Sequence, residues 1–258
     1  MALARPLRHT SSVNSGTAPG AGTVARHGVA RVISKLGMAS RSQATEWVRD
    51  GRVRVNGRGV RDPEFPVRQG LDRIEIDGRP LVAATRIVLM LNKPRGLVTT
   101  TRDERGRDTV YRCFAAAALP WLAPVGRLDK ASEGLLLFSN DPAWAARIAD
   151  PESGPDKTYH VQIDRLPDAA LLRALEHGVV VDGQHLSAKA ARPLRAGRRN
   201  AWLEIVLDEG RNRQIRRLLA ALDVSVLRLV RVAVGPLRLG ELPKGHWRLL
   251  SDREVGSL

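Results

Sequence analysis

The chain of 258 residues is poor in cysteine, histidine and aromatic side chains, and each shortage excludes a class of protein. Its single cysteine, Cys113, supports neither a disulfide framework nor a cysteine-rich zinc site. The six histidines are scattered without the spacing of a metal site, so no metal role is expected. No apolar run approaches the roughly 20 residues of a membrane-spanning helix, and no signal peptide is apparent. We therefore expect a soluble, cytoplasmic protein that does not associate with membranes.

Acidic residues are also few, because 27 of them face 42 basic residues and leave a formal net charge of +15. Such an excess attracts polyanions, and nucleic acid is the first candidate. No acidic residue precedes Glu46, and residues 1–27 are rich in Ser, Gly, Ala, Thr and Arg without periodicity. These features predict a disordered basic arm that contacts RNA or has no function, with an organelle transit peptide as the alternative.

The first ordered unit is predicted to begin at Val29, where apolar residues recur with helical spacing as far as the stop at Gly37. A second helix follows the capping residue Ser40. Two short strands, at 53–55 and 74–76, then turn at Asn-Gly and Asp-Gly dipeptides, which are strong hairpin signals. The pattern therefore indicates two helices followed by a small sheet.

The polar face of this unit carries a series of basic side chains. They are Arg31, Lys35, Arg41, Arg49, Arg52, Arg54 and Arg58. A run of charges is usually just a solvated face, but charges of one sign around two helices and a hairpin favour contact with phosphates. The order helix, A-S-R, helix, G-R-V-R-V-N-G resembles the S4 (α-L) RNA-binding domain. We therefore expect such a domain over residues 28–82.

The rest of the chain is predicted to form a second, larger domain over residues 85–252, followed by a tail at 253–258. Apolar or alternating stretches predict strands at 87–91, 135–138, 157–163, 179–181, 188–192, 202–207 and 226–234. Helical patterns occur at 142–148, 167–177 and about 211–222. Many strands and few helices in irregular order predict an α+β fold with a mostly antiparallel sheet. By pattern alone, the run at 135–138 is also compatible with a buried helical segment.

Asp129 is the first candidate for chemistry, since it follows a Gly-Arg-Leu turn and precedes a loop whose far end is the apolar run 135–138. A loop anchored in the core in this way can hold a reactive group still. Arg127 lies two residues before it. An exposed Asp beside an exposed Arg is common and contributes little to stability. The position between a Gly turn and a buried strand therefore favours a functional role only modestly.

Two further stretches carry candidate residues. Tyr159 lies in a predicted half-buried strand, where an ordinary core aromatic and a base-stacking aromatic are both consistent with the pattern. The run E-G-R-N-R-Q-I-R-R at 209–217 opens a predicted helix, where cations and amides suit phosphates and carboxylates alike. Exposed helical arginines are an equal alternative there. These fragments alone indicate an RNA-binding protein, with or without enzymatic activity.

Taken together, five motifs resemble the RNA pseudouridine synthases of the RsuA-like family. They are N-K-P-R-G-L-V-T-T (92–100), G-R-L-D-K-A-S-E-G-L-L-L-F-S-N-D (126–141), K-T-Y (157–159), E-G-R-N-R-Q-I-R-R (209–217) and L-P-K-G-H-W-R-L-L (242–250). Their order and spacing agree over about residues 28–250. The chain departs from the pattern at Ala131-Ser132 and by an extra Gly and Pro within 150–156, and these departures leave the substrate contacts of the second segment open.

The resemblance implies a catalytic domain of the pseudouridine synthase fold and a cofactor-free isomerisation of uridine to pseudouridine in ribosomal RNA. It assigns the essential catalytic role to Asp129, either as nucleophile or as base. It also implies that Arg216 pairs with this carboxylate, that Arg127 helps displace the target nucleotide, and that Tyr159 stacks on the flipped base. Arg213 is expected to contact RNA.

The expected partner is ribosomal RNA or a ribosome-assembly intermediate, because the S4 domain accompanies the rRNA enzymes of this family. The large subunit is slightly preferred, a monomer is the default, and no metal or nucleotide cofactor is implied. One alternative is a non-catalytic RNA-binding or ribosome-assembly factor, against which the presence of Asp129, Tyr159 and Arg216 argues. The other is a nucleotide-binding enzyme, which is disfavoured because no phosphate-binding glycine motif is present.

Overall fold

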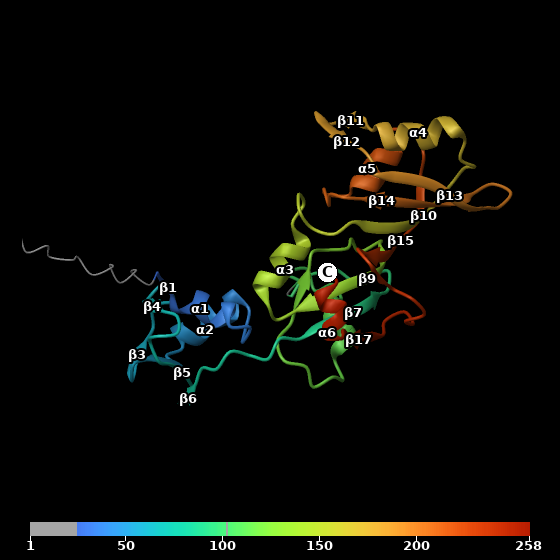
Figure 1. Cartoon of the computed structure of the whole chain (residues 1–258). Coiled ribbons are helices and arrows are strands. Elements are labelled where there is room, and N and C mark those ends of the chain that lie inside the picture. The colour runs from blue at the N-terminus through green and yellow to red at the C-terminus, as the bar shows by residue number, and fades with distance from the viewer. Residues whose placement is uncertain (1–24, 102) are drawn as a thin grey trace, which may run out of the picture.

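A computed structural model of the chain describes residues 25–101 and 103–258 (Figure 1). It consists of a small N-terminal unit and a larger α+β unit joined by a connecting segment at about 81–87. Most of the predicted arm, residues 1–24, lies outside the described residues. The end of that arm pairs as strand β1 (Arg26–Gly28) with β4 (Pro66–Arg68), and both strands contact the first helix of the small unit.

The N-terminal unit has the two helices and the small sheet that its sequence predicts. Its elements are α1 (Val29–Lys35), α2 (Arg41–Arg49), β2 (Val53–Val55), β3 (Arg58–Val60), β5 (Ile74–Ile76) and β6 (Arg79–Pro80), and the sheet order is β3-β2-β5-β6. The hydroxyl of Ser40 caps α2 by accepting the backbone N–H of Gln43 at 3.0 Å. Apolar side chains of both helices, such as Ile33 and Val48, pack with Val53 of the sheet in one core.

The larger unit is organised around a nine-stranded sheet of order β13-β14-β10-β15-β9-β7-β17, with β16 on β15 and β8 on β9. Its strands are β7 (Val88–Lys93), β8 (Ala123–Val125), β9 (Glu133–Ser139), β10 (Lys157–Ile163), β13 (Ala190–Ala196), β14 (Ala201–Leu207), β15 (Val226–Val234), β16 (Leu237–Arg238) and β17 (Trp247–Leu249). All neighbouring strands are antiparallel except β9 and β15. The α+β class with a mostly antiparallel sheet is therefore confirmed, and the run 135–138 is a strand.

Helices and short strands cover the sheet. They are the 3-10 helix η1 (Val110–Phe114), α3 (Pro142–Ala149), α4 (Ala169–His177), β11 (Val179–Val181), β12 (Gln184–Leu186), α5 (Gln214–Ala220) and α6 (Asp252–Gly256). Helices α4 and α5 pack over the half of the sheet that contains β10 and β14 (Figure 1). Helix α6 lies in the segment predicted as a tail, and its Val255 is buried. No helix in the described parts of the chain is long and apolar enough to cross a membrane.

Asn140 ties the connecting segment to the sheet. Its side-chain oxygen accepts the N–H of Ile87 at 2.8 Å, and its amide nitrogen donates to the carbonyl of Thr85 at 2.9 Å. Gly37 of the small unit approaches the Asn140 carbonyl so closely that a Cβ there would lie 2.5 Å from it. The two units therefore meet at a glycine, where a larger residue would separate them.

The two halves of the large sheet meet at Gly134. Strands β9 and β15 pair in parallel over two residues, Glu133 with Val230 and Gly134 with Arg231. Gly134 has a φ of +100°, and a Cβ there would lie 2.2 Å from the Arg231 carbonyl oxygen. Both the backbone conformation and the close approach therefore require glycine.

Replacing Gly134 by alanine should lower the free energy of unfolding by roughly 3 kcal/mol, because left-handed strain is joined by a collision with the backbone. Urea denaturation of the purified protein measures the change. Gly183→Ala is the matched control, since its φ is +73° but nothing lies within 4 Å of the added Cβ. The control should lose only about 1–2 kcal/mol. Equal losses in the two variants would contradict the role assigned to the close approach.

Candidate active site

Asp129 lies on the loop between β8 and β9, and the residues on both sides of it are anchored. The side chain of Leu128 is buried in a core cluster, and its carbonyl accepts the hydroxyl of Thr99 at 2.7 Å. The Asp129 carbonyl accepts the N–H of Ser132 at 2.9 Å, immediately before the fully buried strand β9. The carboxyl group therefore projects from a backbone that is fixed on both sides.

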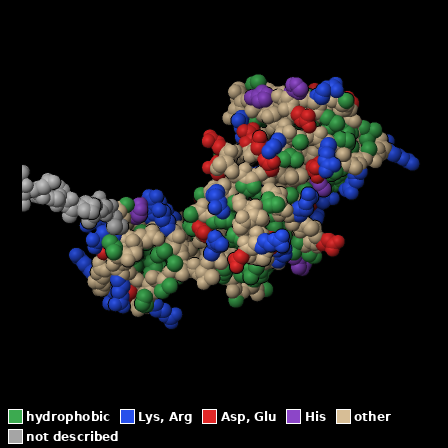
Figure 2. Space-filling view, in the orientation of Figure 1, with side chains coloured by type: hydrophobic (Ala, Val, Ile, Leu, Met, Phe, Trp, Pro, Cys, Tyr) green, Lys and Arg blue, Asp and Glu red, His purple; other side chains and the backbone are tan. Residues whose placement is uncertain are grey.

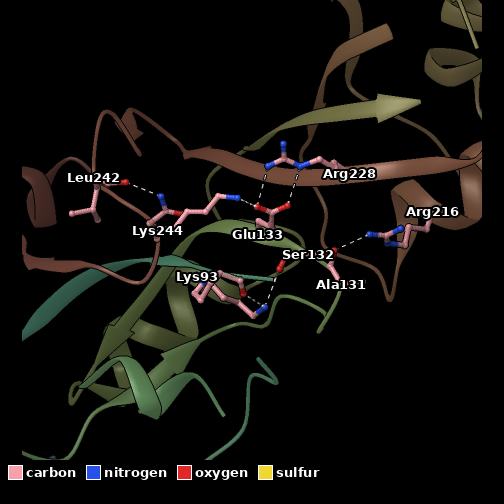
Figure 3. Close-up of polar contacts among 10 residues, drawn as sticks. Lys93, Ala131, Ser132, Glu133, Arg216, Arg228, Leu242 and Lys244 are labelled. Carbon is pink, nitrogen blue, oxygen red and sulfur yellow. Dashed lines mark hydrogen bonds and ion pairs between the residues drawn. The ribbon is translucent and has the colours of Figure 1, made fainter. Parts of the chain in front are cut away.

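Lys93 anchors the same loop from below. Its side chain is fully buried at the end of β7, and its ammonium group donates to the carbonyl of Ser132 at 2.9 Å (Figure 3). It also donates to the carbonyls of Asp129 and Pro94, both at 3.1 Å. Burial lowers the pKa of Lys93 to about 8, against the opposing attraction of Asp129 and Glu133. One buried cation thus fixes the backbone at both ends of the segment 129–132.

A second buried charge, Glu133, follows that segment directly. Its carboxylate, whose side chain is 3% exposed, accepts hydrogen bonds from Arg228 of β15, at 3.1 and 3.2 Å, and from Lys244 (Figure 3). Burial acts to raise the pKa of Glu133, but these hydrogen bonds outweigh it and hold the pKa below its usual value. The start of β9 is therefore joined to β15 and to the loop before β17.

The Asp129 side chain is about one-third exposed, and its ion-pair partner differs from the one that the resemblance implied. Among the described residues the pair is made by Arg213, whose Nη1 lies 3.4 Å from Oδ2. Arg216 instead donates to the carbonyls of Ala131 at 3.3 Å (Figure 3) and Val226 at 3.4 Å. The Asp129–Arg216 pair that the resemblance implies is therefore not formed among the described residues, where Arg213 pairs with the carboxylate.

The start of α5 explains this exchange of partners. The helix begins at Gln214, three residues later than predicted, because Arg213 has a left-handed φ of +49° and ends the preceding turn. Arg213 therefore reaches the loop from outside the helix, whereas Arg216 extends from its first turn into a half-buried position. Burial, followed by repulsion from Arg213, lowers the pKa of Arg216, and attraction to Asp129 opposes both effects.

Arg127, Asp129, Tyr159 and Arg213 line one cavity that encloses about 150 Å³. Tyr159 projects from β10 and is half-buried, with its ring packed against the cores on either side. Arg127 is exposed at the rim, where a wider basic pocket of about 620 Å³ adjoins the cavity. Arg216 lines a separate surface pocket. No group of three or more His, Cys, Asp or Glu residues that could hold a metal ion occurs among the described residues.

The basic residues predicted on the small unit are all exposed there, in a different domain from Asp129 (Figure 2). Two of them are engaged within the chain, because Arg41 pairs with Glu64 at 3.3 Å and Arg52 pairs with Asp77 at 2.5 Å. The others form no ion pair with any described residue. They are Arg31, Lys35, Arg49, Arg54 and Arg58.

Sequence reasoning gave no role to Lys93, Glu133 or Lys244, although all three lie within its motifs. A signal was present for the first two, since each adjoins a run of apolar residues that forms a buried strand. A charge in such a place needs a buried partner. The partners are far away in sequence, and periodicity carries no information about them.

Comparison with known proteins relates both units to described families. The model of the RNA pseudouridylate synthase family matches residues 87–221, and that of the S4 domain matches residues 29–72. An uncharacterized RNA pseudouridine synthase of Aquifex aeolicus is 34% identical over 229 residues, covering 88% of this chain and 92% of that protein. The ribosomal large subunit pseudouridine synthase B of Bacillus subtilis is 35% identical over 230 residues, covering 88% and 93%. A crystal structure of a pseudouridylate synthase has a TM-score of 0.63 at 29% identity, and covers 90% of this chain and 99% of that one.

Replacing Lys93 by methionine should lower the free energy of unfolding by roughly 3 kcal/mol, because three main-chain carbonyls lose their donor. Urea denaturation measures the loss, and Lys35→Met, at an exposed position, is the control that should change it little.

The cost of Lys93→Met should also depend on pH. The folded chain holds this proton with a pKa of about 8, and the unfolded chain with one near the ordinary 10.5. The unfolded state therefore binds more protons between these values, so the contribution of Lys93 to stability rises with pH across that window. Denaturation at about pH 7 and about pH 10 should show a larger deficit of the variant at the higher pH. A deficit that shrinks with pH would contradict the lowered pKa.

Proposed function

The chain belongs to the RNA pseudouridylate synthase family, and from this we propose that its substrate is a uridine of ribosomal RNA and that Asp129 is its catalytic residue. The reaction of the family isomerises uridine to pseudouridine. The observation that supports the assignment is the position of Asp129, which lies at a cavity shared with Tyr159 and Arg213 while its loop backbone is held by Lys93.

The isomerisation conserves every atom of the nucleoside. The N1–C1′ bond breaks and its electron pair stays on the uracil ring. The ring turns while it is held, C5 bonds to C1′ and releases its proton, and N1 takes up a proton, so that the composition is unchanged. Asp129 starts this sequence either as a nucleophile at C1′ or as a base that removes a sugar proton. Both roles need a negative carboxylate, and the neighbouring Arg213 stabilises that charge.

Arg127 and Tyr159 are proposed to handle the nucleotide before the chemistry. A stacked or paired uridine must leave its stack before C1′ can be reached. Arg127, exposed at the rim, is placed to fill the vacated position in the RNA. Tyr159, whose ring is backed by packed side chains, is placed to stack on the uracil that enters the cavity. Arg216 is assigned to hold the Ala131 carbonyl of the catalytic loop.

We propose that residues 28–82 dock on RNA through their basic side chains and that residues 85–252 carry out the reaction. The large ribosomal subunit is the favoured target, because a relative of 35% identity is named as a synthase of that subunit. Ribosomal RNA or an assembly intermediate in the cytoplasm would then be the partner of a monomeric enzyme.

Asp129→Asn should abolish pseudouridine formation while RNA affinity changes less than about twofold, because the isosteric amide keeps the shape of the site but has no negative charge. The test is pseudouridine mapping of total rRNA in cells that lack the protein, rescued by wild type or variant. Asp252→Asn, at an exposed position outside the cavity, is the control that should rescue fully. Normal turnover by Asp129→Asn would refute the catalytic assignment, and rRNA unchanged by deletion would refute the substrate.

Removing unpaired arginines of the S4 domain should weaken RNA binding and reduce its dependence on salt. Arg49→Ala and Arg54→Ala should each lower the slope of log K against log salt concentration by about 1, because each removes one phosphate contact. Filter binding over a range of salt concentrations measures the slope. Arg165→Ala, which removes a cation already paired with Asp168, should leave it unchanged. Equal slopes in all the variants would contradict the docking role.

A further inference from the structure

A second buried lysine, Lys157, lines the cavity that contains Asp129 and Tyr159. It is the first residue of β10, where it lies between Leu207 of β14 and Val234 of β15. The residue is 8% exposed, and its ammonium nitrogen is buried with no hydrogen-bond partner among the described residues. Tyr159 is two positions further along the strand, so both side chains point to the same face of the sheet.

Lys93 shows how this chain satisfies a lysine whose role is structural. The ammonium of Lys93 donates to three main-chain carbonyls and holds a loop with them. Lys157 donates to no such carbonyl, although leaving a buried ammonium group without a hydrogen-bond acceptor costs free energy. Burial, followed by repulsion from Arg231, lowers its pKa. Such a group needs an acceptor that enters the cavity.

The neighbours of Lys157 do not supply that acceptor. Arg231 is itself a cation, and its Nε already donates to the carbonyl of Leu135 at 2.7 Å. The nearby acid Asp156 is paired with Lys189 at 2.8 Å. No other described residue supplies the acceptor, and the cavity that Lys157 lines encloses about 150 Å³. A single water needs only about 10–15 Å³ by the same measure, so there is room for a planar ring.

We propose that the Lys157 ammonium donates a hydrogen bond to the O4 carbonyl of the target uracil and stabilises the negative charge on the ring after it leaves the sugar. The inference rests on the proposed function, in which Asp129 acts at the sugar and Tyr159 stacks on the base. Lys157 and Asp129 line the cavity from different elements, the start of β10 and the loop between β8 and β9. O4 is the uracil carbonyl remote from the sugar, whereas O2 adjoins the glycosidic bond.

The chemistry needs a cation at this position. When the N1–C1′ bond breaks, its electron pair is delocalised over N1, O2 and O4 until C5 bonds to C1′ and releases its proton. A fixed, desolvated ammonium stabilises that charge more than water does, since it needs no reorganisation. It also selects the base, because cytosine carries an amino group in place of O4 and would set donor against donor.

Lys157→Met should lower the single-turnover rate on an RNA that contains the target uridine by about 100-fold, with RNA affinity within about twofold. The same rates are measured on RNA with 4-thiouridine or 2-thiouridine at the target, since sulfur is the weaker hydrogen-bond acceptor. With 4-thiouridine the ratio of wild-type to variant rates should fall to about 10 or below, because the lost contact is already weakened. With 2-thiouridine, the matched control, the ratio should stay near 100.

Thermal denaturation separates this role from a structural one. Lys157→Met should keep or raise the melting temperature, because it replaces an unpaired buried charge by an apolar chain of similar length. A wild-type rate in the variant, the same ratio on all three substrates, or a rate loss that follows a loss of stability would overturn the inference alone. A wild-type protein that forms no pseudouridine would overturn the proposed function and this inference with it.

Discussion

The contact of Gly134 with the backbone of Arg231 holds the whole site together. Asp129 and its loop belong to the half of the sheet that contains β9 and β7, whereas Tyr159 and Arg213 belong to the half that contains β10 and α5. These halves pair over two residues, and at Gly134 the backbone of β9 comes too close to β15 for a Cβ. A small displacement at this crossing would move the carboxylate relative to the tyrosine. Catalysis depends on such distances, so the glycine at position 134 is needed for the reaction as well as for the fold.

Two buried charges reinforce the same crossing, and a third lines the cavity without doing so. Lys93 is satisfied by main-chain carbonyls and fixes the loop. Glu133 is satisfied by Arg228 and Lys244 and links β9 to β15 and to the loop before β17. Lys157 has no partner among the described residues. The first two are the ordinary solution to burying a charge, and the third departs from it inside the cavity, where departures of this kind accompany function.

The elements of this fold were predictable where their signals are local. The helices after Ser40 and Asp141 and the hairpin turning after Val55 follow from caps, turn dipeptides and apolar spacing within a few residues. The short strand β17 carries no such signal, because it pairs with β7, which is far away in the sequence. Local signals were present for β16, which turns back on β15 after two residues, and for α6, which begins with a capping box of Ser251 and Glu254, but the sequence analysis did not use them. The motifs located the loop of Asp129 for the same local reason.

The geometry of the candidate site was harder to predict from the sequence, because it depends on the backbone dihedral angles of single residues. A left-handed φ at Arg213 delays the start of α5 and decides that this arginine, rather than Arg216, reaches Asp129. Arginine does not favour a left-handed backbone conformation, so no residue propensity could have indicated it. The two arginines nevertheless act on one loop, Arg213 on its carboxylate and Arg216 on the carbonyl of Ala131. The basic motif therefore supports the loop through two different contacts, and its dense arginine content follows from both needs.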